Sequence, residues 1–319
     1  MNLSVIIPTY NGRHLLEQTL AHNIERLGSQ ATQWLIADDG STDDTATWIA
    51  THHPTITYIR STANHGFAAT VAMGAAQATG THLLFLNNDM AIQTWDWDTL
   101  VAAFNDETLF ALVPQIIRPS KDNNFESITW GKFEGGWLTT ESYAPAQLTP
   151  QTASGRPVLW ACGGAMVVPR AKYDALDGFD PLFSPFYFED LDLSYRAWKQ
   201  GWSSCYLNFA LVHHQHQATI GRLFTPSQIT YFHRTNHYLM MWKNLDDPRY
   251  KINHFLTALI KILTLQLTDC RAILAALRRL PEIRRYRLNR PTPTASDRQI
   301  LESVWTALHD PQHAMEFRE

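Results

Sequence analysis

The stretch Thr81–Met90, THLLFLNNDM, places a short apolar run directly before three polar residues. Leu83–Leu86 has the length and composition of a buried strand. A turn alone would account for Asn87, Asn88 and Asp89, because Asn and Asp side chains bond to nearby backbone groups. The Asp89 carboxylate is also an oxygen ligand that a hard divalent cation accepts, with phosphates and water completing its shell. The stretch therefore predicts a strand that ends in either a turn or a metal site.

Similar apolar runs alternate with helical patterns through the first third of the chain. Strands are expected over 3–10, 33–40, 56–61 and 82–89, and helices over 13–28, 41–53 and 66–80. This alternation predicts an α/β fold with a mostly parallel sheet covered by helices on both faces. Ligands of such sheets bind at the carboxyl ends of the strands. Thr9, Asp38 and Asn87 each fall at such an end, so we expect their surroundings to form one polar rim.

Later segments are less regular. Residues 119–155, rich in Gly, Trp, Thr and Pro, are expected to form a long irregular insertion. Order returns with a strand over 158–170, a helix over 188–201 and a strand over 203–214, and the pattern is helical from about Thr225.

Composition excludes several classes of protein. The chain has 319 residues, a formal net charge of −4 and 14 His, so nothing favours nucleic acid as a partner. Three cysteines without a C-x-x-C pair indicate a reduced, cytoplasmic protein rather than a disulfide framework or a cysteine zinc site. The first residues lack the pattern of a signal peptide, and no apolar run reaches the length of a membrane span.

Asp38 and Asp39 follow the second predicted strand. One interpretation is a turn with Ser41 or Thr42 as a helix N-cap. Two adjacent carboxylates exceed what a cap needs, and one of them is suited to accept the imide N–H of a pyrimidine base while Tyr10 covers the ring. The chain has no G-x-G-x-x-G after its first strand and no P-loop, so a nucleotide would be held in another way.

Glu189, Asp190 and Asp192 begin a predicted helix. Acidic residues favour helix N-termini because the helix dipole offsets their charge. Alternatively, a carboxylate beside Phe186–Phe188 is partly desolvated, has a raised affinity for protons and suits a general base.

His213, His214 and His216 end the last predicted strand. Side chains alternate along a strand, so His214 and His216 should share one face and His213 the other. A neutral imidazole is a competent metal ligand, although surface histidines without a function are common.

Seven motifs occur in a fixed order: SVIIPTYNG, LIADDGSTDDT, NHGFAA, LLFLNNDM, CGGAMVVPR, GFDPLFSPFYFEDLDLSYRAWKQG and LVHHQHQAT. Together, over Leu3–Asn244, they resemble the inverting glycosyltransferases of family 2, which have the GT-A fold. The resemblance implies a GT-A catalytic domain over residues 1–244, with a nucleotide-binding half (1–118) and an acceptor and catalytic half (119–244). An amphipathic, Arg-rich helical extension would occupy residues 245–319.

The resemblance also implies roles for individual residues. Asp190 matches the catalytic base, with Glu189 and Asp192 as supporting neighbours, and Asp89 and His213 match the metal ligands. The positions that match the donor-binding site, with Asn11 and Asp38 grouped among them, are Pro8, Thr9, Tyr10, Asn11, Asp38, Asp39, Asn64, Gly66, Phe67, Asn88, Gly163 and Gly164.

The resemblance implies a function: metal-dependent transfer of a sugar, with inversion of configuration at the anomeric carbon. Mg²⁺ or Mn²⁺ would act as a Lewis acid on the donor diphosphate, and Asp190 would take the proton of an acceptor hydroxyl. The donor would be a UDP- or dTDP-sugar, and the Asn87–Asn88–Asp89 variant resembles that of rhamnosyltransferase-like branches. The acceptor would be a glycan or lipid-linked molecule in cell-surface polysaccharide synthesis. Two alternatives stay open: a sugar-phosphate nucleotidyltransferase, and a non-catalytic protein that binds nucleotide sugars.

The C-terminal extension has an apolar stripe at three-to-four spacing. Its members are Ile252, Phe255, Leu256, Leu259, Ile260, Leu263, Leu267, Cys270, Leu274 and Leu277. Seven arginines accompany or follow it: Arg271, Arg278, Arg279, Arg284, Arg285, Arg287 and Arg290. Such a helix docks on the inner face of the plasma membrane, packs on the catalytic domain, or forms a homodimer interface, and these alternatives stay open.

Overall fold

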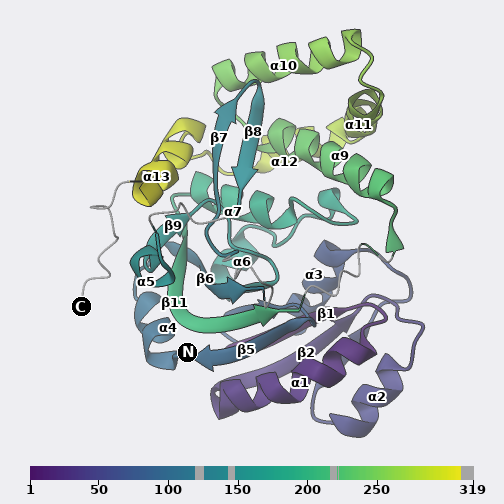
Figure 1. Ribbon diagram of the computed structural model, residues 1–319, viewed down its shortest axis with the longest axis vertical. Coiled ribbons are helices and arrows are strands. Elements are labelled where there is room, and N and C mark those ends of the chain that lie inside the picture. Colours follow the sequence, from purple (N-terminus) through teal and green to yellow (C-terminus); the bar gives the residue numbers. More distant parts are fainter. Residues whose placement is uncertain (119–125, 143–147, 216–220, 222, 310–319) are drawn as a thin grey trace.

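The computed structural model of the protein describes residues 1–118, 126–142, 148–215, 221 and 223–309 (Figure 1). The strands are β1 (Leu3–Thr9), β2 (Ala31–Asp38), β3 (Thr57–Arg60), β4 (His82–Leu86), β5 (Met90–Trp95), β6 (Leu109–Ile117), β7 (Trp130–Glu134), β8 (Trp137–Glu141), β9 (Arg156–Val158), β10 (Ala165–Pro169) and β11 (Ser203–His214). The helices are α1 (Arg13–Leu27), α2 (Thr45–His52), α3 (Phe67–Gln77), α4 (Trp97–Ala103), α5 (Pro150–Ala153), α6 (Arg170–Ala175), α7 (Glu189–Lys199), α9 (Pro226–Asn244), α10 (Pro248–Leu263), α11 (Leu267–Arg278), α12 (Leu280–Asn289) and α13 (Asp297–His309).

One large sheet has the strand order β3-β2-β1-β4-β10-β6-β11-β5, with β9 paired to β11. β1 runs parallel to β2 and β4, β2 to β3, and β6 to β11. β10, β5 and β9 run antiparallel to their neighbours. The predicted α/β fold with a mostly parallel sheet and a helical C-terminal region is therefore confirmed.

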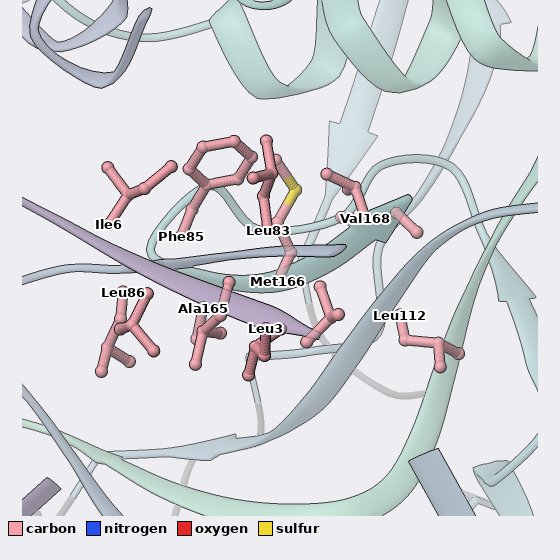
Figure 2. Packing of buried hydrophobic residues seen from close by; sticks show 14 of the residues in the cluster. Leu3, Ile6, Leu83, Phe85, Leu86, Leu112, Ala165, Met166 and Val168 are labelled. Carbon is pink, nitrogen blue, oxygen red and sulfur yellow. The ribbon is translucent and has the colours of Figure 1, made fainter. Parts of the chain in front are cut away.

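Helices cover both faces of this sheet, and in the view of Figure 1 α3 lies above it and α1 below. The small residues of α3 permit a close approach, since a Cβ on Gly74 would lie 2.6 Å from Ile6 Cγ2. Strand alternation divides the core between the two faces: Figure 2 shows Ile6 and Phe85 on one side of the sheet and Leu86 on the other. The apolar run Leu83–Leu86 is fully buried, as its composition predicts.

Two sequence-based expectations are wrong in detail. The strand expected over 158–170 is two strands, β9 and β10, because the chain leaves the sheet between them at Gly163–Gly164. The insertion expected to be irregular contains the antiparallel hairpin β7–β8. Its turn residues, Gly135 and Gly136, both have positive φ, which is the conformation that a two-residue hairpin turn needs.

The C-terminal helices share a second hydrophobic core with β7–β8 and α7. Tyr195 of α7, Tyr238 of α9, Ile273 of α11 and Ile300 of α13 are all buried in it. The division at residue 244 stays a prediction about domains, but the helices beyond it are packed against the rest of the chain.

Asp297, at the first residue of α13, is a buried junction in this second core. It accepts hydrogen bonds from Tyr195 Oη at 2.8 Å and from the backbone N–H groups of Asp246 and Asp247 at 2.6 and 2.7 Å. Lys199 Nζ lies 2.6 Å from the same carboxylate. Asp297 therefore connects α7, α13 and the junction between α9 and α10.

Among the helices that the structure describes, none has both the length and the apolar character needed to cross a membrane.

Candidate active site

The carboxyl ends of β1, β2 and β4 meet as the sequence predicts. Thr9 lies beside Asp38 in the parallel register of β1 and β2. Asn88 follows β4, and its Nδ2 donates to Thr9 Oγ1 at 2.9 Å. Gly12 closes over this contact, since a Cβ there would lie 2.3 Å from both bonded atoms. The structure thus brings these polar residues to one rim.

Asp38 and Asn11 hold the backbone of the loop after β2. Buried Asp38 accepts from the Ser41 N–H at 2.8 Å and from the Tyr58 hydroxyl. Burial and this hydrogen bond raise the pKa of Tyr58. Asn11 Oδ1 accepts from the Thr42 N–H at 2.7 Å. Both side chains have a structural task here, and their predicted contact with a nucleotide stays a prediction.

Asp39 fixes the loop that precedes α3. Its two carboxylate oxygens accept the N–H groups of His65 and Gly66 at 2.8 and 2.9 Å. Gly66 has φ +88°, and a Cβ there would lie 2.9 Å from the carbonyl oxygen of Pro185. The loop is therefore held between β2 and the segment that leads into α7, and only glycine fits at position 66.

The remaining donor-site candidates on this side line the rim at different depths. Pro8 and Tyr10 are half-buried, Asn64 is exposed, and Phe67 lies at the start of α3. Their roles toward a nucleotide sugar stay predictions.

Asp89 contacts His214 rather than the predicted His213. His214 Nε2 lies 3.3 Å from Asp89 Oδ2, and its Nδ1 lies 3.1 Å from Glu126 Oε2. Burial lowers the pKa of His214, but hydrogen bonds to Asp89 and Glu126 outweigh it and raise the pKa to about 9. Strand alternation places His213 on the other side of β11, and His216 lies outside the described residues.

Glu126 is a residue of this cluster that sequence reasoning missed. It lies within the segment expected to be irregular, so no periodicity or motif marks it. Its carboxylate is also paired with Arg118, at the end of β6.

α1 anchors the segment that carries Asp89. Thr19 Oγ1 donates to the carbonyl of Asn88 at 2.9 Å, and Asn23 Nδ2 donates to the carbonyl of Met90 at 2.9 Å. The N–H of Ile92 in turn donates to Asn23 Oδ1 at 2.8 Å. The carboxylate of Asp89 is thus carried on backbone that is fixed on both sides.

Asp190 lies at the first turn of α7, where its Oδ2 accepts the Gly163 N–H at 3.2 Å. A Cβ on Gly163 would lie 3.4 Å from Asp190 Cβ and 3.5 Å from the ring of Phe67. Burial raises the pKa of Asp190. A carboxylate with a raised proton affinity beside a donor-site candidate has the properties of a general base.

Glu189 precedes Asp190 and is also desolvated. Burial, together with the nearby Asp190 charge, raises the pKa of Glu189 to about 8. Its Oε2 is buried and has no hydrogen-bond partner among the described residues. Glu189 is therefore expected to retain a proton at neutral pH.

Asp192 has a different environment, although it is only two residues from Asp190. It is completely buried and lies 2.7 Å from Arg196 Nε, 2.8 Å from Lys243 Nζ and 2.8 Å from Asn244 Nδ2. These charges lower the pKa of Asp192 against the effect of its burial. The structure thus places Asp192 in an ion-pair network between α7 and α9, apart from the Asp190 carboxylate.

The backbone before α7 is strained, and hydrogen bonds from α9 hold it in place. Tyr187 and Phe188 have φ of 73° and 76°, which is unfavourable for aromatic residues. Asn236 of α9, a buried residue that sequence reasoning missed, donates through Nδ2 to the carbonyls of Phe183, Phe186 and Tyr187 at 2.7, 2.9 and 3.1 Å. This strain at the entrance to Glu189 and Asp190 is typical of functional sites.

Gly163 and Gly164 join the two carboxylates predicted to act together. The carbonyl of Gly164 accepts the Asn87 N–H at 2.8 Å, two residues before Asp89. The N–H of Gly163 donates to Asp190. One peptide link and two hydrogen bonds therefore connect the end of β4 to the start of α7, and that Asp89 and Asp190 act on one substrate stays a prediction.

The residues around Asp89 fit a divalent cation that takes only one or two of its ligands from the protein. Asp89 offers a carboxylate oxygen, and His214 would offer Nε2 once a cation displaces the proton shared with Asp89, since only a neutral imidazole binds a metal. In the described part of the chain, no group of three or more His, Cys, Asp or Glu residues has the arrangement to hold a metal ion. Mg²⁺ and Mn²⁺ sites that complete their shell with substrate phosphates need only one or two protein ligands.

Comparisons with known proteins agree with this geometry. The profile described as "Glycosyl transferase family 2" matches residues 4–172, more than half of the chain. An N-acetylglucosaminyl-diphospho-decaprenol L-rhamnosyltransferase of Mycobacterium tuberculosis is 26% identical over 244 residues, which are 69% of this chain and 78% of that protein. The O-antigen chain rhamnosyltransferase WbaN of Salmonella anatum is 26% identical over 220 residues, 68% of this chain and 67% of that protein.

Solved structures show the same fold at low sequence identity. GalNAc-T7, crystallised with UDP, GalNAc and Mn²⁺, superposes with a TM-score of 0.69 at 17% identity, over 96% of this chain and 57% of that one. The mannosyltransferase PcManGT of Pyrobaculum calidifontis, in complex with GDP-Man and Mn²⁺, gives a TM-score of 0.53 at 17% identity, over 97% of this chain and 87% of that one. With its GT-A architecture and the family profile spanning β1 to α6, the chain belongs to glycosyl transferase family 2.

Proposed function

We propose that this glycosyltransferase moves a sugar from a UDP- or dTDP-sugar to a hydroxyl of a glycan or lipid-linked acceptor, with inversion at the anomeric carbon. The single observation that carries the proposal is the connection of Asp190, a carboxylate with a raised pKa, through Gly163–Gly164 to the segment that bears Asp89. A base and a diphosphate-binding group on one site are what direct displacement needs.

In this mechanism Asp190 accepts the proton of the acceptor hydroxyl. The hydroxyl oxygen forms a bond to the anomeric carbon while the bond from that carbon to the donor diphosphate breaks. The nucleoside diphosphate departs with the electron pair, and no covalent enzyme intermediate is formed. A general base of this kind contributes roughly 10²–10⁴-fold to the rate.

A divalent cation would be held by Asp89 and His214. When bound, Mg²⁺ or Mn²⁺ would supply positive charge beside the diphosphate of the donor. Glu126, on the far side of His214, would orient the imidazole. GalNAc-T7 and PcManGT, which share the fold, both contain Mn²⁺, and this supports the choice of cation.

The names of the relatives support the choice of substrates. Both rhamnosyltransferases are 26% identical to this chain, and one name specifies an acceptor linked through diphosphate to decaprenol. We therefore propose a dTDP-linked deoxysugar such as rhamnose as the first donor to test, and a polyprenyl-diphosphate-linked glycan as the acceptor in polysaccharide synthesis.

A panel of UDP-, dTDP- and GDP-sugars tests the proposal, with release of nucleoside diphosphate as the readout. We expect turnover with one class of donor, dependence on Mn²⁺ or Mg²⁺, and its loss in Asp89→Ala. Release of pyrophosphate instead would indicate a nucleotidyltransferase. Donor binding without turnover, with every acceptor class offered, would indicate a non-catalytic binding protein.

A further inference from the structure

Exposed apolar side chains gather on α10 and on the turn that follows it. α10 exposes Ile252, Phe255, Leu256, Leu259, Ile260 and Ile262, of which Phe255 is 67% exposed. Phe255, Leu259 and Ile262 also line an apolar cavity between α10 and α11, whereas Ile252, Leu256 and Ile260 do not. The turn between α10 and α11, residues 263–267, adds Leu263, Leu265 and Leu267, which are 72%, 74% and 72% exposed. We call this turn the leucine turn. An exposed patch of this kind marks an interaction site on a protein.

The leucine turn is held by backbone hydrogen bonds to the last turn of α10. The N–H of Thr264 donates to the Ile260 carbonyl at 2.9 Å, and the N–H of Gln266 donates to the Lys261 carbonyl at 3.0 Å. Leu265 adopts φ 50°, a conformation that favours Gly or Asn. A leucine is unfavourable in this conformation, and its side chain lies in solvent.

The segment that carries these apolar side chains is rich in positive charge. Residues 248–290 contain 10 Lys and Arg and 2 Asp and Glu, whereas the whole chain has a net charge of −4. One of the two acids, Asp269, is buried and paired with Lys261 at 3.0 Å. Arg271, Arg278, Arg284 and Arg285 are exposed and have no acidic partner among the described residues.

Two of the seven arginines predicted to flank the apolar stripe are used inside the protein. Arg287 Nη2 and Arg290 Nη2 lie 2.7 and 2.6 Å from Asp246 Oδ1. Their contribution is to the packing of α12. Arg279 is paired with Glu282 at 2.6 Å, so the exposed positive charge without an acidic partner among the described residues comes from Arg271, Arg278, Arg284 and Arg285.

We propose that α10 and the leucine turn dock on a bilayer surface rich in anionic lipid. An apolar face with a basic flank lies in the interface of such a membrane, with its leucines among the acyl chains and its arginines at the phosphates. A second copy of the chain fits less well, because a twofold interface would place the arginine flank of one copy near that of the other. Packing within the protein is excluded for the described residues by the exposure of the leucine turn.

Docking would orient the active site because α10 is fixed to the catalytic domain. His254 Nδ1 lies 2.9 Å from the carbonyl of Gly136 at the tip of β7–β8, and Tyr250 stacks on Phe133 with ring centroids 4.1 Å apart. In Figure 1 α10 lies at the end of the molecule opposite α1 and α2. This inference extends the proposed function, since a lipid-linked acceptor is presented at a bilayer, but vesicle binding does not depend on it.

Flotation of the full chain with phosphatidylcholine vesicles, with and without phosphatidylglycerol, tests the docking in the absence of donor and acceptor. We expect binding to the anionic vesicles at low salt and at least about ten-fold weaker binding to the neutral ones, with a further loss as salt screens the arginines. The variant Leu263→Ser/Leu265→Ser/Leu267→Ser should lose at least about ten-fold in binding. Val101→Ser, at another exposed apolar residue on α4, should bind as the wild type does.

Light scattering on the same proteins tests whether a second copy of the chain binds this surface instead of a membrane. A wild-type dimer that the triple leucine variant converts to a monomer would overturn the proposal in favour of self-association. Equal binding of the triple variant and the wild type, or no binding to anionic vesicles, would also overturn it. Donor turnover with the triple variant should be unchanged, so failure of docking and failure of the proposed transfer activity are distinguished.

Discussion

Matched amide substitutions at Asp190 and Asp192 are expected to separate catalysis from stability within one turn of α7. The two changes are chemically identical, and the positions are two residues apart. Asp190 accepts a backbone N–H beside the donor-site candidates, whereas Asp192 is surrounded by Arg196, Lys243 and Asn244.

Asp192→Asn removes the negative charge that two buried cations share. Breaking a buried ion pair costs about 3–5 kcal/mol. Asp180, 2.6 Å from Lys243 Nζ, still compensates one cation, which favours the lower end of that range. For a chain of 319 residues, a loss of about 3 kcal/mol lowers the melting temperature by roughly 4–5 °C. Turnover per folded molecule should stay near that of the wild type.

Asp190→Asn should do the reverse. Its carboxylate is desolvated, with its pKa raised by burial, so a neutral amide of the same shape is tolerated in the fold. We expect an unchanged melting temperature, retained donor binding and a loss of roughly 10²–10⁴-fold in transfer.

Thermal melts and donor turnover on both variants are the assay. If Asp192→Asn melts with the wild type but loses turnover, Asp192 acts in catalysis and the reasoning from its ion pairs is refuted. If Asp190→Asn transfers sugar at a near-normal rate, it is not the base.

Three further changes address the rest of the site. Glu189→Gln should flatten the pH dependence of stability, because the raised pKa of Glu189 contributes stability that is fully present below 4.5 and lost as the pH rises to about 8. The melting temperatures of the two proteins should therefore diverge between about pH 4.5 and pH 8 and differ by a constant amount above it; parallel curves across that window would contradict this. Glu126→Gln should raise the Mn²⁺ concentration for half-maximal turnover by about 10–100-fold, because it weakens the support of His214; an unchanged metal requirement would show that Glu126 is dispensable. Asn236→Asp replaces the amide that donates to three carbonyls with a group that accepts hydrogen bonds. We expect the loop before α7 to move, Asp190 to be displaced and the transfer rate to fall by about 10²-fold. A crystal structure of the variant in which this loop has not moved would contradict the explanation.

Much of the fold could be predicted because local patterns and tertiary structure agree in the first third of the chain. β1 and β2 are each buried between two parallel neighbours and therefore read as continuous apolar segments, whereas β3 is a short, half-exposed edge strand. The hairpin β7–β8 was expected to be irregular although its Gly135–Gly136 turn is a recognisable signal. The break between β9 and β10 contains the same signal, the pair Gly163–Gly164, where the N–H of Gly163 donates to Asp190.

Within the site, periodicity explains part of what was predicted and part of what was missed. Helical residues two apart project about 200° from each other, so periodicity separates Asp190 from Asp192, although the family resemblance grouped Asp192 with Asp190 as a supporting neighbour. Alternation separates His213 from His214, but only the register of β11 with β5, which pairs His214 with Met90, shows which one reaches Asp89. Asn236 is far from the acidic motif in sequence and could not be connected with it.

The contacts of Asp297 with α7 determine whether the C-terminal helices can be removed or exchanged with those of a relative. A shortened protein that stops after α9 would leave Tyr195 and Lys199 of α7 without their shared carboxylate and would open one of the two hydrophobic cores to water. The C-terminal helices are thus not an interchangeable accessory: grafting them from a relative would require the matching contacts on α7. Loss of activity on truncation would accordingly report unfolding of the catalytic helix, and single side-chain changes are the informative way to study the C-terminal region.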